Sequence, residues 1–188
     1  MERRRVVITG IGAVTPIGNS APQAWQAVRD GVCGIGPITQ YDSSTQKVHL
    51  AAEVKDFDPA AALEGRDWRH MSRYAQLAMA SAQEAIADSA LALEQLDCNR
   101  CGVIVSSGIG GISTTEREGL RCAQRGYDRA SPYYIPMAIA NMAAGLIAIA
   151  FGFKGMCTCP VTACAGGTNA VGDAFRHIRD GYAEVMLC

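Results

Sequence analysis

The chain alternates short apolar runs, rich in β-branched residues, with longer segments of helical pattern. The apolar runs predict strands at residues 6–10, 102–107, 158–162 and 183–188. Helices are predicted at residues 21–30, 67–90, 137–153 and from Cys164 to about residue 180. Strands that are apolar on both faces and separated by helices are typical of sheets covered by helices. The order of elements therefore predicts an α/β layered fold.

Two segments could be mistaken for membrane signals. Arg3, Arg4 and Arg5 imitate the charged start of a signal peptide, but glycines and a proline break the apolar stretch that follows. Residues 137–153 are apolar except for Asn141, yet about 17 residues is short for a spanning helix. They predict a helix in the core of a soluble domain. We therefore expect a cytoplasmic protein without a membrane partner.

Composition excludes several further classes of protein. Hydrophobic residues make up 49% of the chain, which supports a packed core. The net charge of -1 gives no nucleic-acid footprint. Most of the eight cysteines are expected to be reduced and to act as small apolar residues. The pairs Cys98/Cys101 and Cys157/Cys159 have metal-like spacing but lie far apart in sequence, so no metal site is predicted. A cysteine-metal protein remains an alternative that zinc content would test.

The motif with the clearest chemistry is Thr162-Ala163-Cys164-Ala165-Gly166-Gly167, between a predicted strand and a predicted helix. Small residues allow a tight turn that would expose Cys164 at the edge of the sheet. The helix N-terminus would favour the thiolate, and its free N–H groups could stabilise an oxyanion. Gly166 and Gly167 would let a substrate approach closely. A buried structural cysteine is the alternative.

A thiolate nucleophile usually needs a proton acceptor, and the chain has three histidines. His177 follows Cys164 by thirteen residues on the same predicted helix, which separates them by roughly 20 Å. His70 and His49 lie in no motif that would bring them to Cys164. If Cys164 is catalytic, its bases are expected outside these residues.

Five motifs in order give the sequence a family resemblance. They are Val6-Val7-Ile8-Thr9-Gly10-Ile11-Gly12, Thr15-Pro16-Ile17-Gly18, Ser107-Gly108-Ile109-Gly110-Gly111, Asn141-Met142-Ala143-Ala144-Gly145 and Thr162-Ala163-Cys164. The chain resembles the N-terminal half of β-ketoacyl-[acyl-carrier-protein] synthases of the elongating type, close to synthase II. The resemblance implies a thiolase-like fold of two duplicated halves, in which residues 1–188 form a truncated N-terminal domain. The active-site histidines and a lysine would belong to the other half.

The resemblance implies an acyltransferase of fatty acid biosynthesis that uses no cofactor. Cys164 would take an acyl chain from acyl carrier protein as a thioester. Malonyl-carrier protein would then lose carbon dioxide, and its carbanion would attack the acyl group. The product would be a 3-oxoacyl-carrier protein, longer by two carbons.

Other site residues are implied with the same resemblance. Ile109 matches the residue that gates the acyl pocket. Tyr134 and Ile135 match a segment that borders the acyl pocket of the partner subunit in a homodimer. Three arginines, Arg66, Arg69 and Arg73, would form part of the basic surface that receives the acidic carrier protein.

Three other expectations stay open at this stage. A starter-type condensing enzyme or a polyketide ketosynthase would share the motif around Cys164. A non-catalytic role, such as that of a chain-length partner or fragment, is disfavoured by the presence of Cys164. The isolated half would expose an apolar face where the second half packs, and little condensing activity is expected from it alone.

Overall fold

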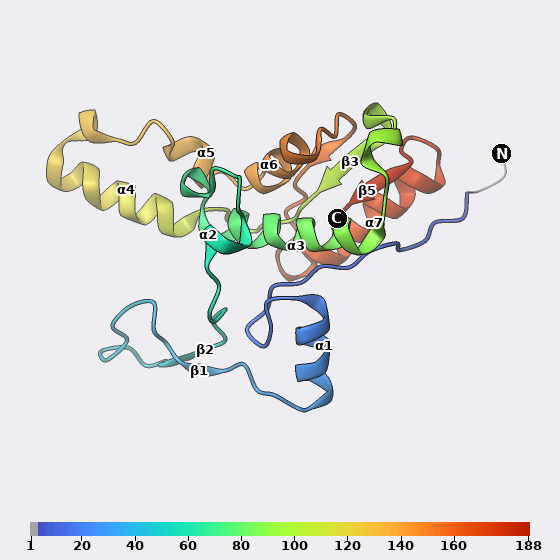
Figure 1. The fold of residues 1–188 in the computed structure, drawn as a ribbon. Helices are drawn as coiled ribbons and strands as arrows, with labels where there is room; N and C mark the ends of the chain where they lie inside the picture. The colour runs from blue at the N-terminus through green and yellow to red at the C-terminus, as the bar shows by residue number, and fades with distance from the viewer. Residues whose placement is uncertain (1–3) are drawn as a thin grey trace.

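The computed structural model describes residues 4–188, and its core is a three-stranded parallel sheet (Figure 1). The strands of the described chain are β1 (Gly36–Pro37), β2 (Leu50–Ala51), β3 (Cys101–Ile104), β4 (Cys157–Thr158) and β5 (Val185–Leu187). In the parallel sheet β3 lies between β4 and β5, with Val103 paired to both Cys157 and Leu187. Strands β1 and β2 form a separate antiparallel pair.

Helices cover both faces of this sheet. The α-helices are α1 (Ala21–Arg29), α2 (Pro59–Ala62), α3 (Arg73–Ser89), α4 (Ile112–Arg125), α5 (Tyr134–Ala138), α6 (Met142–Phe151) and α7 (Gly166–Arg179). Cys101 and Val103 of β3 pack in the cluster that contains residues of α3 and α6. Ile104 packs instead with Ala170 and Ala174 of α7. This alternation along β3 is the two-residue period of a strand, so the predicted α/β layered fold is confirmed.

The predicted strand at residues 6–10 was wrong, because these residues do not form a hydrogen-bonded strand. The segment is extended but runs along α3, where Asp88 accepts a hydrogen bond from the Ile11 N–H at 2.9 Å. A Cβ atom at Gly10 would lie 2.1 Å from the Ala85 carbonyl oxygen, so glycine permits this close approach. Strand pairing needs an adjacent edge, and a groove separates residues 6–10 from β5.

Two of the predicted helices begin or break at positions that the pattern did not give. The helix expected from residue 67 starts at Arg73, after a 3-10 turn (Trp68–His70). The helix expected over 137–153 is divided into α5 and α6, because the backbone at Ile139 is extended. The Tyr74 hydroxyl donates to the freed Ile139 carbonyl at 2.6 Å, and burial raises the pKa of Tyr74.

The apolar segment of α6 is largely a core element, as predicted. Ala143, Ala144 and Ile147 are buried, whereas Ile149 is 77% exposed. No helix in the described residues is long and apolar enough to cross a membrane. The remaining predicted helices are confirmed at α1 and α7. The N–H of Gln23 donates to the Ser20 hydroxyl, which caps α1.

Helix α4 was not predicted from the sequence. With a 3-10 turn (Tyr127–Arg129) and α5 it forms an arm that extends from the sheet (Figure 1). Its buried positions are polar, Thr114 and Glu118, so no apolar stripe marked it. The Glu118 carboxylate accepts a hydrogen bond from the Ser131 N–H at 2.9 Å and so closes the arm on itself.

Candidate functional site

Cys164 lies on a strained turn between the parallel sheet and α7. It occupies a 3-10 turn (Ala163–Ala165) that leads directly into α7, and its side chain is exposed. Ala163 adopts a φ of 48°, in the left-handed region that residues with a Cβ atom rarely enter. Such strain persists only where surrounding contacts fix it, and it is concentrated at functional sites. The structure therefore places Cys164 on the tight, exposed turn that the sequence predicted.

Ser106 fixes this turn from the sheet side. Its hydroxyl donates to the Pro160 carbonyl at 2.8 Å, which links the end of β3 to the segment after β4. A Cβ atom at Gly166 would lie 1.9 Å from the Ser106 hydroxyl oxygen. Gly166 is thus required for packing against Ser106 and is buried, contrary to the expected role in substrate approach. Gly167 is exposed, and a Cβ atom there would meet nothing within 4 Å.

The N-terminus of α7 provides the electrostatic setting of Cys164. Ala165 is the N-cap residue, and no side chain accepts from the first N–H groups of the helix. Those N–H groups carry the positive end of the helix dipole, which attracts an anion. The last turn of α7 holds basic residues, the arrangement that the dipole favours at that end. An oxyanion that forms beside Cys164 would therefore be stabilised.

The turn that carries Ile109 lies beside the Cys164 turn, at the carboxyl ends of β3 and β4. The Cys159 thiol donates to the Ser107 carbonyl at 3.8 Å, which joins the Ile109 turn to the segment that leads from β4 to the Cys164 turn. The Gly111 N–H donates to the Ala138 carbonyl at 2.9 Å, which joins the Ile109 turn to α5. Ligand sites of α/β proteins typically form outside the carboxyl ends of parallel strands.

Within one chain, the residues predicted to border acyl pockets therefore lie on contiguous elements, whichever copy's pocket they border. Ile109 is 66% exposed, Ile135 is 56% exposed, and Tyr134 is half-buried at the start of α5. The glycines that permit the close approach are Gly110, with a φ of 74°, and Gly111, where a Cβ atom would lie 2.0 Å from the Met137 carbonyl oxygen. Their packing role was not evident from the sequence, where they are only part of a motif.

The three predicted carrier-protein arginines differ in their surroundings. The Arg66 guanidinium lies 5.3 Å from the centre of the Phe151 ring, and the Arg73 guanidinium lies 4.7 Å from that of Phe57. Both side chains are half-buried, whereas Arg69 is exposed. Cation–π contacts of this kind position an arginine as well as stabilising it.

Two of the three histidines have partners away from Cys164, and the third is exposed in a loop. The His70 ring stacks on Tyr133 with centroids 3.6 Å apart, and its Nδ1 atom lies 2.6 Å from Asp67. The His177 Nδ1 atom lies 3.1 Å from the Asp173 carbonyl oxygen. His49 is exposed in the loop before β2. The described residues thus offer Cys164 no imidazole base.

The other cysteines are free thiols in varied surroundings. Cys101 is fully buried in β3, and burial raises the pKa of its thiol. Burial also raises the pKa of Cys157 and Cys188. Within residues 4–188, no group of three or more histidine, cysteine or acidic residues is arranged to hold a metal ion.

An apolar groove of about 530 Å³ lies between residues 6–10, α7 and β5. Val7 is 60% exposed and Ile8 is 80% exposed, and Phe175 of α7 is 44% exposed. Isolated apolar residues are common at protein surfaces, but a contiguous apolar groove indicates a surface made for contact. A bare apolar face was expected of the isolated half.

Known structures share this arrangement of sheet, turn and helices. The ishigamide ketosynthase/chain length factor is similar over 100% of this chain and 47% of its own, with a TM-score of 0.91 at 28% identity. The AntDE ketosynthase, solved with its acyl-carrier protein AntF, matches 99% of this chain and 50% of its own, with a TM-score of 0.82 at 26% identity. The class defined by this fold and cysteine turn is therefore that of thiolase-like ketosynthases.

Sequence comparison gives the family. The family model "Beta-ketoacyl synthase, N-terminal domain" matches residues 3–188, and the chain belongs to this family. Curated relatives include 3-oxoacyl-[acyl-carrier-protein] synthase 2 of Synechocystis, 46% identical over 188 residues, and that of Coxiella burnetii, 42% identical over 187 residues. The synthase 2 of Staphylococcus aureus is 40% identical over 186 residues. The chain spans 45% of the length of each of these relatives.

Proposed function

We propose that this chain is the nucleophile-bearing half of a 3-oxoacyl-[acyl-carrier-protein] synthase of fatty acid biosynthesis. The observation that carries the proposal is the exposed Cys164 on its strained turn, directly before the uncapped N-terminus of α7. Relatives that are 40% to 46% identical carry the name of this enzyme. The reaction would take place in the cytoplasm, where these substrates are made.

In the proposed first step, the Cys164 thiolate attacks the carbonyl carbon of an acyl thioester on acyl carrier protein. The tetrahedral oxyanion would be stabilised by N–H groups at the start of α7. The carrier's thiolate leaves and takes up a proton, and the acyl group remains on Cys164 as a new thioester. This step uses the residues of the Cys164 turn and a carrier, and the base that would generate the thiolate is expected outside the described residues.

In the proposed second step, malonyl-carrier protein loses carbon dioxide and its α-carbon attacks the thioester on Cys164. A new carbon–carbon bond forms, and the Cys164 thiolate leaves. Stabilising the developing enolate requires donors that the described residues do not place at Cys164, since His70 and His177 have other partners and His49 is exposed in the loop before β2. We assign those donors to a second half that packs on the apolar groove beside β5.

The arrangement also supports two proposed partners. Acyl carrier protein is the first, and the AntDE ketosynthase has been solved with such a carrier. A second copy of the enzyme is the other, because Ile135 and Tyr133 of the arm are 56% and 44% exposed. In this proposal, the acyl pocket beside Ile109 is completed by Tyr134 and Ile135 of the second copy.

Mass spectrometry of the intact chain after incubation with a long-chain acyl-carrier protein tests the proposal. One acyl group should be added, and peptide mapping should place it on Cys164. Cys164→Ala should abolish the addition. Cys33→Ala should leave it intact, because Cys33 is also exposed but lies in the loop after α1. Acylation spread equally over exposed cysteines, or retained in Cys164→Ala, would refute the assignment.

A polyketide ketosynthase is the second candidate, because one structural neighbour is described as part of a type II polyketide system. This neighbour is 26% identical to the chain, well below the 46% identity of the 3-oxoacyl-[acyl-carrier-protein] synthase 2 of Synechocystis. Comparing Cys164 loading by long-chain acyl-carrier protein and by a poly-β-ketoacyl-carrier protein would separate the two. Faster loading from long-chain acyl-carrier protein would support the 3-oxoacyl-[acyl-carrier-protein] synthase of fatty acid biosynthesis.

A further inference from the structure

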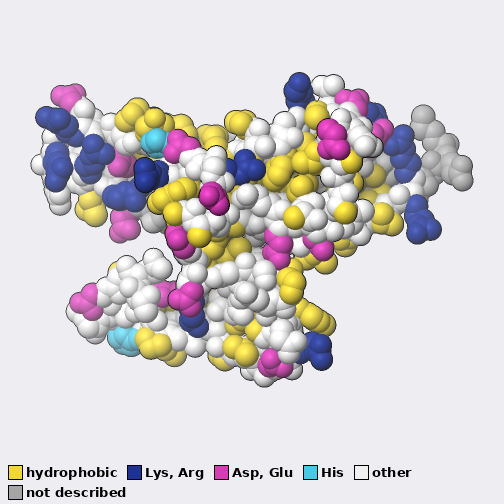
Figure 2. All heavy atoms as spheres, viewed as in Figure 1, with side chains coloured by type: hydrophobic (Ala, Val, Ile, Leu, Met, Phe, Trp, Pro, Cys, Tyr) yellow, Lys and Arg dark blue, Asp and Glu magenta, His cyan; other side chains and the backbone are white. Residues whose placement is uncertain are grey.

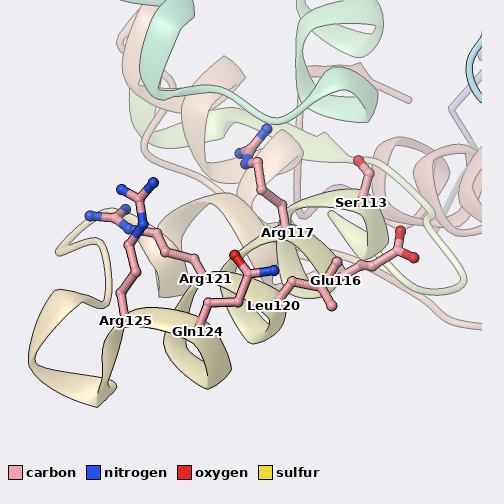
Figure 3. Close-up of a pocket in the computed structure, with 7 residues that line it drawn as sticks. All are labelled: Ser113, Glu116, Arg117, Leu120, Arg121, Gln124 and Arg125. Carbon is pink, nitrogen blue, oxygen red and sulfur yellow. The ribbon is translucent and has the colours of Figure 1, made fainter.

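Helix α4 carries a row of arginines that the proposed chemistry at Cys164 does not use. The row consists of Arg117, Arg121 and Arg125, spaced four residues apart. Arg129 follows at the end of the 3-10 turn Tyr127–Arg129, after α4. In a helix this spacing aligns side chains on one face, and the three span about 12 Å. Figure 3 shows all three projecting from the same side of α4. In Figure 2, dark blue side chains gather over this end of the molecule.

Two surface hollows follow this row. One of about 590 Å³ is lined by Arg117, Arg121 and Arg125 together with Leu120, which is 58% exposed. A neighbouring one of about 400 Å³ is lined only by Arg121, Arg125 and Arg129. The exposed leucine that lines the larger hollow gives the surface an apolar contact beside the positive charge.

Neighbouring acidic side chains do not neutralise the positive charge of this row. Glu118 is buried and turned into the arm, where it accepts from the Ser131 N–H. It also lies 3.4 Å from Arg121, which is therefore partly compensated. Glu116 lines the margin of the larger hollow, and Asp128 is exposed next to Arg129. The row remains locally positive on a chain whose net charge is -1.

The row is continuous with the surface that sequence resemblance assigned to carrier binding. A third hollow of about 330 Å³ is lined by Arg69, Arg73 and Arg117. Arg117 therefore joins the two sets of arginines across α3 and α4. The described surface forms one basic track from Arg69 to Arg129.

We propose that Arg117, Arg121 and Arg125 bind an acidic helix of acyl carrier protein, so that the docking surface extends along α4. The inference rests on the proposed function, which supplies the acidic partner. Like charges four residues apart destabilise an isolated helix, so this row costs α4 stability and is not explained by folding. A helical partner with acidic residues at the same spacing would match it, and Leu120, which lines the same hollow, offers an apolar contact beside the row. Nucleic acid is the less suitable polyanion, because its binding domains are strongly basic overall.

The experiment measures binding of fluorescently labelled holo-acyl carrier protein to the 188-residue chain at low and at moderate salt. The triple variant R117E/R121E/R125E should weaken binding by about tenfold or more and flatten its salt dependence. The matched control is Arg29→Glu, an exposed arginine near the end of α1. It should change the affinity by less than about twofold. Circular dichroism checks that each variant is folded, and R117Q/R121Q/R125Q serves if the reversal variant is not.

Loading of Cys164 by a small acyl thioester without a carrier separates this inference from the proposed function. If Cys164 is loaded by the small thioester in wild type and triple variant alike, while only the variant loses carrier binding, the inference is supported. If both proteins bind the carrier equally well, it is overturned although the enzyme assignment stands. If an RNA oligonucleotide of equal charge competes as well as the carrier, the surface is a general polyanion site and the inference is also overturned.

Discussion

Ser106 and Gly166 are in such close contact that a Cβ atom on Gly166 would lie 1.9 Å from the Ser106 hydroxyl oxygen. This contact joins the carboxyl end of β3 to the first residue of α7, two positions after Cys164. The geometry of the nucleophile turn therefore depends on Ser106, which is distant in sequence, as well as on the local motif. A substitution at either position should therefore alter the geometry of the turn that carries Cys164.

Gly166→Ala should destabilise the chain by about 1–3 kcal/mol, the usual cost of overpacking. Urea denaturation measures this. Gly167→Ala is the control, because a Cβ atom there meets nothing within 4 Å, and alanine favours a helix by up to about 1 kcal/mol over glycine. The double variant S106G/G166A should recover part of the loss. Equal effects of alanine at 166 and 167 would contradict the close contact.

Glu84 of α3 fixes the segment that precedes α1. Its two carboxylate oxygens accept from the Ala13 N–H and the Ala21 N–H, each at 2.8 Å. Glu84→Gln removes one acceptor and should cost about 1–3 kcal/mol of unfolding free energy. Hydrogen exchange at the Ala13 and Ala21 amides should accelerate with it.

The control for this change is Glu94→Gln, at an exposed glutamate in the 3-10 turn Leu93–Gln95. It should leave both amides protected and stability within about 0.5 kcal/mol of wild type. Unchanged exchange at Ala13 and Ala21 in Glu84→Gln would show that other contacts hold this segment.

The sequence was sufficient wherever structure is local. The turn at Cys164, α1 and α7 all follow from motifs or periodicity within a short window. Cys164 itself could be singled out because small residues, a strand and a helix N-terminus surround it in sequence. The spacing of His177 likewise predicted that it lies too far along the helix to serve Cys164.

The sequence was insufficient where a distant contact decides. Residues 6–10 have strand composition, but in the described chain they run along α3 instead of pairing with β5. Helix α4 buries Thr114 and Glu118, so it lacked an apolar stripe. The break between α5 and α6 coincides with Ile139, whose carbonyl binds Tyr74 from a separate helix. The role of Gly166 required Ser106, which no local pattern connects to it.

Glu118 should make the arm sensitive to acid. The N–H of Ser131, helped by Arg121 and Arg117, holds the pKa of the Glu118 carboxyl below its ordinary value of 4.5. A lowered folded-state pKa means that its stabilising effect is complete above the ordinary pKa and is lost as pH falls through the lower one. Unfolding free energy measured from about pH 6 to pH 3 should therefore decline less steeply in Glu118→Gln than in wild type.

Glu116→Gln is the control for the pH experiment, because Glu116 is exposed on the same helix. Its pH profile should follow that of wild type. Identical slopes for wild type and Glu118→Gln would show that the carboxylate does not stabilise the arm.

Gly111→Ala should displace the Ile109 turn from α5. The new Cβ atom would lie 2.0 Å from the Met137 carbonyl oxygen, while the Gly111 N–H now donates to Ala138 at 2.9 Å. Overpacking here should cost about 1–3 kcal/mol. Because Ile109 is proposed to gate the acyl pocket, the chain-length dependence of Cys164 loading should also change. Gly108→Ala is the control, since a Cβ atom there meets nothing within 4 Å. If Gly111→Ala lowers stability but leaves the chain-length profile unchanged, the Ile109 turn does not border the acyl chain, and the proposed gate is refuted independently of the role of Cys164.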